Sequence, residues 1–140
     1  MYLLKTEADF DSAHFLAGYD GKCHNIHGHR WNVVVTICAE ALEGQGQTRG
    51  MLVDFSTLKD SLREEAGSLD HTFIIEKGSL RCETLRALKE EGFSLFQVPF
   101  RPTAENLARY FYQRMKARGY AVKQAEVYET PVNCAVYSGE

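Results

Sequence analysis

The run "WNVVVTICAEAL" at residues 31–42 constrains the fold more than any other feature, because its β-branched side chains favour an extended strand. Directly before it stands "HGH", in which His27 and His29 lie two residues apart. If the strand begins at these histidines, its two-residue period points both imidazoles to one side of the sheet. The chain is therefore expected to contain a strand that starts with two potential metal ligands.

Strand-like segments are grouped at the two ends of the chain. Residues 2–10 alternate well enough to predict a first strand, and a long irregular stretch is expected over residues 11–26. Residues 121–139 predict two strands around a turn at Thr130 and Pro131, and "EGQGQTRG" at residues 43–50 is typical of a turn. The side chains expected on one face of the first strand are Tyr2, Leu4, Thr6, Ala8 and Phe10.

The middle of the chain is predicted to be helical. Asp54 can cap a helix over residues 55–67, and Thr103 can cap a longer helix that Gly119 closes. A short helix is expected within residues 79–92, after a loop and a short extended segment at residues 69–75. Strands at both ends of a helical middle favour an α+β fold with an antiparallel sheet of two strand pairs and helices packed on one face. The apolar positions at helical spacing are Phe55, Leu58, Leu62, Ala66 and Leu69 in the first helix and Leu107, Phe111 and Met115 in the last.

Length, charge and cysteine usage exclude several classes of protein. The 140 residues are expected to form one domain, residues 1–140, and the formal net charge of −3 argues against broad nucleic-acid binding. No apolar run approaches the roughly 20 residues of a membrane helix, and "MYLLKTEADF" lacks the pattern of a signal peptide. The four cysteines form no C-x-x-C pair, which fits a reduced, cytoplasmic protein, and Cys38 and Cys134 are expected to be buried.

A third histidine can complete a metal site with His27 and His29. His14 is a good candidate because the loop that follows it could fold it back, and zinc is the commonest metal for imidazole ligands. Three histidines with an open fourth position are typical of catalytic zinc, whereas structural zinc is closed by four protein ligands. Three alternatives stay open: a closed site with Cys23 as fourth ligand, His24 in place of one histidine, and histidines that bind no metal.

Four motifs in this chain resemble those of a known family. They are "SAHFLAGYDGKCHNIHGH" (residues 12–29), "LDHTFI" (69–74), "PTAENLARYF" (102–111) and "VYETPVNCAVY" (127–137). In this order they are similar to the superfamily of 6-pyruvoyltetrahydropterin synthase and 6-carboxytetrahydropterin synthase, over almost the whole chain. The resemblance implies the tunnelling fold, in which pairs of antiparallel strands and helices assemble into oligomeric barrels, commonly hexamers, with active sites at subunit interfaces. The match is weakest over residues 76–101, where an interface element or a pocket wall is expected.

The resemblance also implies roles for individual residues. The family's zinc ligands match His14, His27 and His29, and its catalytic cysteine matches Cys23. Its catalytic Asp–His pair matches Asp70 and His71. The glutamate that anchors the pterin matches Glu129, and further pocket residues match Thr103 and Glu105. From the residues alone, simpler interpretations stay open: a turn for the Asp–His pair, a solvated position for the glutamate, and a cap or helix-dipole partner for the pocket residues. Three basic residues could meet the substrate's anionic groups, namely Lys22, Arg30 and Arg101.

The substrate that the resemblance implies is 7,8-dihydroneopterin triphosphate. The C-x3-H-G-H spacing from Cys23 to His29 is like that of the bacterial branch, which yields 6-carboxytetrahydropterin, acetaldehyde and triphosphate on the route to queuosine. An open zinc ion can acidify substrate hydroxyls, Cys23 as a thiolate can abstract a proton, and His71 can shuttle one. Glu129 can accept two hydrogen bonds from the pterin ring. The alternatives are a synthase that stops at the pyruvoyl product and a non-catalytic, zinc-stabilised binding module.

Overall fold

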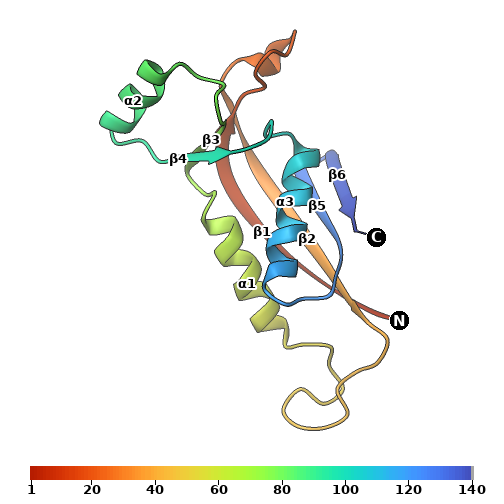
Figure 1. The fold of residues 1–140 in the computed structure, drawn as a ribbon. Helices are drawn as coiled ribbons and strands as arrows, with labels where there is room; N and C mark the ends of the chain where they lie inside the picture. Colours follow the sequence, from red (N-terminus) through yellow and green to blue (C-terminus); the bar gives the residue numbers. More distant parts are fainter. Residues whose placement is uncertain (140) are drawn as a thin grey trace.

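The computed structural model describes residues 1–139, in which six strands form one sheet of order β4-β3-β1-β2-β5-β6 (Figure 1). Four strands pair antiparallel with one another: β1 (Tyr2–His14), β2 (His27–Ala39), β5 (Val122–Thr130) and β6 (Asn133–Ser138). Two short strands, β3 (Thr72–Glu76) and β4 (Leu95–Val98), extend the sheet in parallel beyond β1. The predicted pairs of antiparallel strands are therefore confirmed, and the sheet as a whole is mixed.

The first strand is longer than the sequence pattern predicts. β1 continues past Phe10 to His14 because residues 11–14 keep pairing with the first residues of β2, with Asp11 opposite Arg30 and His14 opposite His27. The irregular stretch thus begins at residue 15 and holds only the short 3-10 helix η1 (Lys22–His24). β2 does begin at His27, as expected if the histidine pair opens the strand.

Two helices cover one face of the sheet, as predicted (Figure 1). α1 (Phe55–Gly67) begins where the Asp54 carboxylate accepts a hydrogen bond from Ser56 N, and α3 (Ala104–Ala117) begins where Thr103 Oγ1 accepts one from Asn106 N. These caps satisfy backbone donors that lack partners at a helix start. The expected apolar stripes are buried except at Phe55, whose side chain is exposed because it lies at the first position of α1.

The core follows one row of side chains along each central strand. In β2, Trp31, Val33, Val35 and Ile37 point toward the helices and are fully buried, and His27 and His29 precede them in the same two-residue period. The corresponding rows end at His14 in β1 and at Glu129 in β5. The polar residues at the end of these rows therefore share the helix-covered side of the sheet with the core.

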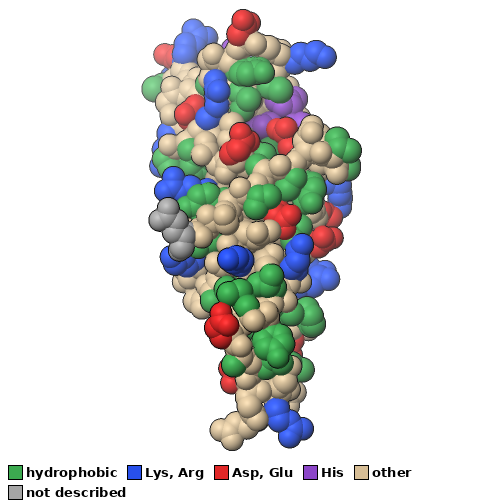
Figure 2. Space-filling view, turned by 90° about the vertical axis from the view of Figure 1, so that its right-hand side faces the viewer, with side chains coloured by type: hydrophobic (Ala, Val, Ile, Leu, Met, Phe, Trp, Pro, Cys, Tyr) green, Lys and Arg blue, Asp and Glu red, His purple; other side chains and the backbone are tan. Residues whose placement is uncertain are grey.

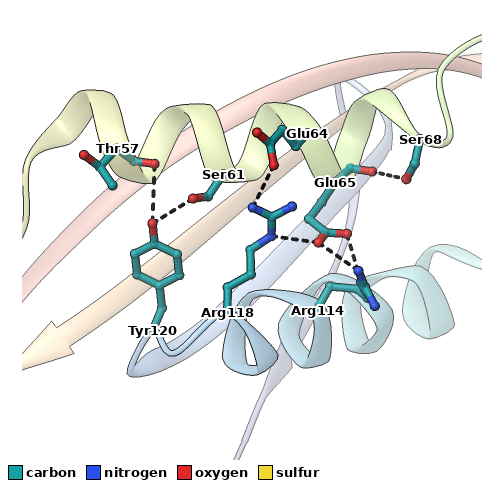
Figure 3. Close-up of polar contacts among 8 residues, drawn as sticks. All are labelled: Thr57, Ser61, Glu64, Glu65, Ser68, Arg114, Arg118 and Tyr120. Carbon is teal, nitrogen blue, oxygen red and sulfur yellow. Dashed lines mark hydrogen bonds and ion pairs between the residues drawn. The ribbon is translucent and has the colours of Figure 1, made fainter.

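A second polar cluster joins α1 to the end of α3 (Figure 3). The buried Glu65 carboxylate accepts from Arg114 Nε at 2.9 Å, from Arg118 Nε at 2.8 Å and from Arg114 Nη2 at 3.2 Å. Burial raises the pKa of this carboxyl, but the hydrogen bonds and positive charges of the two arginines outweigh burial and leave the pKa lowered. Beside it, Tyr120 OH lies 2.8 Å from Ser61 Oγ. The cluster fixes the two sheet-covering helices to one another.

The third helix, α2 (Cys82–Glu90), lies within the stretch where the family resemblance is weakest. It projects from the body of the molecule and connects β3 to β4 (Figure 1), and in the described chain it has no buried residue. No helix in residues 1–139 is long and apolar enough to cross a membrane. The expected burial of Cys134 is wrong, since its side chain is exposed on the edge strand β6, and Cys38 is half-buried.

Candidate metal centre and active site

Four side chains converge at the end of the core-facing rows of β1, β2 and β5. Their ligand atoms, from His14, His27, His29 and Glu129, all lie within 4.8 Å of one another. His14 Nε2 is 3.1 Å from His27 Nε2, and Glu129 Oε1 is 3.4 Å from the Nε2 atoms of both His14 and His29. The three predicted histidine ligands are therefore brought together.

Backbone carbonyls orient two of the imidazoles. His14 Nδ1 lies 2.7 Å from Pro102 O, and His27 Nδ1 lies 2.7 Å from Asn25 O. A carbonyl oxygen can only accept, so each Nδ1 carries the proton and each Nε2 is left with its lone pair directed into the cluster. Two lone pairs 3.1 Å apart repel each other unless a cation lies between them. A hydrogen bond from the Nδ1 proton to a backbone carbonyl is the usual way in which a metal-binding histidine is oriented.

His29 supplies the strongest sign that the cluster is built for a metal. Its Nε2 atom is buried and has no hydrogen-bond partner among the described residues. A buried polar atom without a partner is costly, and such atoms are commonly paired with water or an ion. Three imidazole nitrogens and a carboxylate suit a divalent first-row metal, zinc included. The residues present therefore fit the expected metal.

Electrostatics also suit the cluster for a cation. Burial lowers the pKa of His14 to about 4, a shift to which the neighbouring His27 and His29 also contribute. Burial lowers the pKa of His29 as well, although Glu129 acts in the opposite direction. Both imidazoles are therefore neutral at neutral pH, which is the form that binds a metal.

Cys23 lies outside the metal cluster. It is half-buried in η1, and its carbonyl accepts a hydrogen bond from Leu16 N at 2.8 Å, which closes the loop that follows His14. Neither Cys23 nor His24 belongs to the group of described residues whose ligand atoms converge, and the fourth member is Glu129 instead. The structure thus favours a site of three histidines and Glu129 over a closed site with a cysteine ligand.

Asp70 and His71 form an exposed ion pair next to β1. His71 Nδ1 is 2.9 Å from Asp70 Oδ2, Asp70 Oδ1 accepts from Asp11 N at 2.8 Å, and His71 N donates to Asp11 O at 2.7 Å. The Asp11 N–H and then the His71 imidazole lower the pKa of Asp70, and Asp70 in turn raises the pKa of His71. His71 has φ of 57°, a left-handed conformation that non-glycine residues adopt rarely and often at functional sites.

The metal cluster and the Asp–His pair border the same surface. A hollow of about 420 Å³ is lined by both His29 and His71, together with Arg30. A larger hollow of about 820 Å³ is lined by His29 and Glu129. Figure 2 shows the histidines reaching the surface near one end of the molecule, next to acidic side chains. A ligand in either hollow would therefore lie beside the metal cluster.

Thr103 and Glu105 have structural surroundings in this chain. Thr103 caps α3, and Glu105 is exposed in the first turn of that helix. The motif nevertheless touches the site through Pro102, whose carbonyl orients His14. No sequence signal marks a backbone carbonyl as a partner for a histidine 88 residues away. The role of the two side chains in a ligand pocket stays a prediction.

Trp31 is a residue of the site that the sequence interpretation missed. Its ring packs edge-on against His14, with centroids 4.9 Å apart, and against His29, at 5.2 Å, and its Nε1 donates to Ser12 O at 3.2 Å. It stands two residues after His29 in the same strand period, and this spacing could have revealed it. Trp31 separates the histidines from the apolar core.

Fold and site together define a protein with a helix-covered mixed sheet and, at its end, a cluster of side chains that could hold a metal ion. More specifically, the chain belongs to the 6-pyruvoyl tetrahydropterin synthase family, whose profile matches residues 3–140. The predicted resemblance, and with it the prediction of an enzyme, is confirmed.

Individual relatives agree with this assignment. The chain is 34% identical over 140 residues to a protein of Haemophilus influenzae named 6-carboxy-5,6,7,8-tetrahydropterin synthase, an alignment covering 98% of this chain and 99% of the relative. A Synechocystis protein of the same name is 32% identical, covering 82% of this chain and 97% of its own.

Solved structures confirm the predicted tunnelling fold. An uncharacterized Wolinella succinogenes protein matches with a TM-score of 0.84 at 23% identity, covering 99% of this chain and 98% of its own. A Plasmodium vivax 6-pyruvoyltetrahydropterin synthase matches with a TM-score of 0.70 at 23% identity and the same coverage.

Proposed function

We propose that this protein is a zinc-dependent 6-carboxytetrahydropterin synthase that converts 7,8-dihydroneopterin triphosphate to 6-carboxy-5,6,7,8-tetrahydropterin, acetaldehyde and triphosphate, a step toward queuosine. The observation that carries the proposal is the convergence of His14, His27 and His29, with the buried Nε2 of His29 left without a hydrogen-bond partner in the described chain. The names of the curated relatives and the C-x3-H-G-H spacing support the carboxy-forming reaction.

His14, His27 and His29 would hold the metal. A bound zinc ion supplies Lewis-acid stabilisation of negative charge on the oxygen atoms of a hydroxylated substrate. The carbonyls of Pro102 and Asn25 keep two imidazoles in the metal-binding tautomer, and Trp31 keeps the inner side of the site dry. The chain's own part is thus to fix three nitrogen donors next to a solvent-facing hollow.

Two further groups are assigned to proton transfer. Cys23 lies outside the ligand set, so its thiol is available to take a proton from the substrate side chain. His71, with its pKa raised by Asp70, can hold a proton near neutral pH and give it up at the substrate. Both lie on exposed or half-exposed segments that a ligand can reach.

Glu129 is assigned to the pterin ring. Its carboxylate reaches the metal cluster on one side and lines the hollow of about 820 Å³ on the other. A carboxylate at that border can accept two hydrogen bonds from the 2-amino group and the ring N–H of a pterin. Thr103 and Glu105, at the start of α3, are proposed to complete the pocket.

Product analysis tests the reaction. The purified, zinc-loaded protein is incubated with 7,8-dihydroneopterin triphosphate, and acetaldehyde, triphosphate and pterin products are measured. Acetaldehyde together with the carboxy pterin is expected. The second candidate, 6-pyruvoyltetrahydropterin synthase, is favoured by the fold shared with the Plasmodium vivax enzyme. Release of triphosphate with a pyruvoyl product and no acetaldehyde would establish that candidate instead.

Replacement of the thiol separates the enzyme from a zinc-stabilised binding module. Cys23→Ala is expected to retain zinc and the folded state while turnover falls by about 100-fold or more, the range of a lost proton-transfer group. Cys134→Ala, on the exposed edge strand, is the matched control and is expected to behave as the unchanged protein. Loss of zinc from Cys23→Ala would make Cys23 a ligand and contradict the proposal.

The remaining assignments concern the setting of the enzyme. We propose that residues 1–140 form one domain, that the protein acts in the cytoplasm without nucleic-acid or membrane partners, and that it assembles as a homo-oligomer, a hexamer by family resemblance. Light scattering of the purified protein measures its mass directly. A monomer that is fully active would contradict the oligomeric assignment.

A further inference from the structure

The segment that precedes α3 touches both halves of the proposed active site. Pro102 O holds His14 Nδ1 at 2.7 Å, which fixes a metal ligand. Its neighbour Arg101 reaches in the other direction, to the loop at residues 15–26 that carries Cys23, and donates from Nη2 to Ala17 O at 2.6 Å. No role described above uses this half-buried guanidinium.

Arg101 also makes a second contact with the same loop. Its guanidinium carbon lies 5.8 Å from the centre of the Tyr19 ring, within the range of a cation–π interaction. The Tyr19 ring in turn lies against Gly21, where a Cβ atom would be only 2.6 Å from Tyr19 Cε1. Gly21 directly precedes the 3-10 helix that contains Cys23. Contacts therefore lead from Arg101 through Tyr19 to Gly21, at the start of the short helix that carries Cys23.

The loop has few other tethers. Between Gly18 and Ile26 every side chain is exposed except that of Cys23, so burial does little to hold the loop in place. The hydrogen bond from Leu16 N to Cys23 O, 2.8 Å long, joins the two ends of the loop but does not attach it to the rest of the protein. Phe15 packs on Phe73 at the start of the loop and Asn25 O meets His27 Nδ1 at its end, and Arg101 supplies the attachment between these two points.

Arg101 is itself held firmly at the start of α3. Its carbonyl accepts from Thr103 N at 2.8 Å and from Asn106 Nδ2 at 2.9 Å. The backbone from which the guanidinium extends therefore belongs to the capped end of a helix packed on the core. This makes residues 101–102 a rigid reference for the loop on one side and for His14 on the other.

We propose that Arg101 is a positioning residue that sets the Cys23 thiol relative to the metal ligands, through Ala17 O and the Tyr19 ring. The inference rests on the proposed function for the role of Cys23. It distinguishes Arg101 from Lys22 and Arg30, the other basic residues considered for the substrate's anionic groups. Arg101 is half-buried and its Nη2 is engaged by the loop, whereas Lys22 and Arg30 have exposed side chains and Arg30 pairs with Asp9 and Asp11.

The test compares Arg101→Ala with Arg101→Lys and with Arg109→Ala as matched control. Arg109 makes a similar contact, 5.9 Å from the centre of the Tyr137 ring, but with strand β6 and not with this loop. Peptide-resolved hydrogen exchange over residues 16–24, zinc content and steady-state kinetics are measured for each. Arg101→Ala is expected to raise exchange in this loop about 10-fold and to lower kcat about 10- to 100-fold at unchanged KM and zinc content, because misplacement of a reacting group by about 1 Å costs rate rather than binding. The lysine variant should recover part of the loss, and Arg109→Ala should match the unchanged protein.

A second pair of variants approaches the same contacts from the loop. Gly21→Ala places a methyl group against the Tyr19 ring, whereas Gly44→Ala points into open space. Gly21→Ala is expected to reproduce the exchange and kcat changes of Arg101→Ala, and Gly44→Ala to show neither.

Two outcomes would overturn the proposal: unchanged loop exchange in Arg101→Ala, or a raised KM at unchanged kcat, which would make Arg101 a substrate ligand. Exchange and zinc content need no pterin. If the unchanged protein fails to convert dihydroneopterin triphosphate, the proposed function falls while the exchange data still decide whether Arg101 holds the loop.

Discussion

Two polar clusters on the helix-covered side of the sheet differ in one physical respect. In the Glu65 cluster (Figure 3), both carboxylate oxygens accept hydrogen bonds from Arg114 or Arg118. In the metal cluster, His29 Nε2 has no hydrogen-bond partner among the described residues, although Glu129 Oε1 is 3.4 Å away, and the Nε2 atoms of His14 and His27 face each other. A buried polar group that is fully paired stabilises a fold, whereas one left unpaired points to a missing ligand. Burial and charge alone therefore do not distinguish the Glu65 cluster from the metal cluster; the pairing of their polar atoms does.

Removal of a metal ligand should give the largest effect on function. His27→Ala is expected to lower zinc affinity by more than about 100-fold, since loss of an outer partner alone costs 10- to 100-fold, and to abolish turnover with it. Zinc content by elemental analysis and turnover of the pterin substrate measure this. His24→Ala, three residues earlier and outside the cluster, is the control. Full zinc occupancy in His27→Ala would show that His27 is not a metal ligand and would contradict the comparison of the two clusters.

Loss of both arginines should give the largest effect on stability. Arg114→Ala combined with Arg118→Ala leaves the Glu65 carboxylate, only 3% exposed, without a countercharge, at a cost of about 3–5 kcal/mol in the free energy of unfolding. Chemical denaturation measures the cost. The zinc content of the folded fraction should not change. A double variant as stable as the unchanged protein would show that the paired cluster contributes little.

Protonation of Glu65 at acid pH should remove the contribution of the Glu65 cluster to the stability of the fold. The pKa of Glu65 is lowered from its ordinary value of 4.5, so its contribution is complete above that pH and is lost as the pH falls through the lower folded-state value. The unchanged protein should therefore lose stability as the pH falls below about 4.5. Glu65→Gln cannot titrate and should show a flatter stability profile at acid pH. Parallel profiles for the two proteins would contradict this assignment.

Two helix caps give the smallest and most selective comparison. Asp54→Ala and Thr103→Ala each remove one side-chain hydrogen bond to a helix start and should each cost about 1 kcal/mol. Only Thr103 stands next to Pro102, whose carbonyl orients His14, so only Thr103→Ala should also weaken zinc binding, by up to about 10-fold. Thermal unfolding and competitive zinc titration measure the two effects. Equal zinc affinities in both variants would show that the cap does not act on the site.

The sequence predicted much of the local structure because its signals are local. The Asp54 and Thr103 caps, the strand that begins at His27 and the extended segment after His71 all depend on neighbouring residues, and all are confirmed. β4 and the parallel pairing of β3 with β1 were missed. That pairing joins Ser12 to Thr72, sixty residues apart, with no turn to announce it.

The candidate site divides in the same way. The shared side of His27 and His29 follows from strand period, and His14 was expected as their partner. The Asp70–Asp11 hydrogen bond, the carbonyl of Pro102 and the approach of Glu129 to the histidines were not predicted. Each of these contacts joins segments that are distant in the sequence, and chemistry-bearing residue types alone do not specify which distant groups meet.

By itself, then, the sequence determined the helices, the caps, the strands other than β4, the three histidines that converge and the family to which the chain belongs. Only the tertiary structure decided that Glu129 rather than Cys23 stands beside those histidines, that the Pro102 carbonyl orients His14, and that Arg101 ties the Cys23 loop to the start of α3. The physical reason is the range of the interactions. Side-chain period and capping act over a few residues, whereas these contacts exist only after the sheet and α3 have packed together.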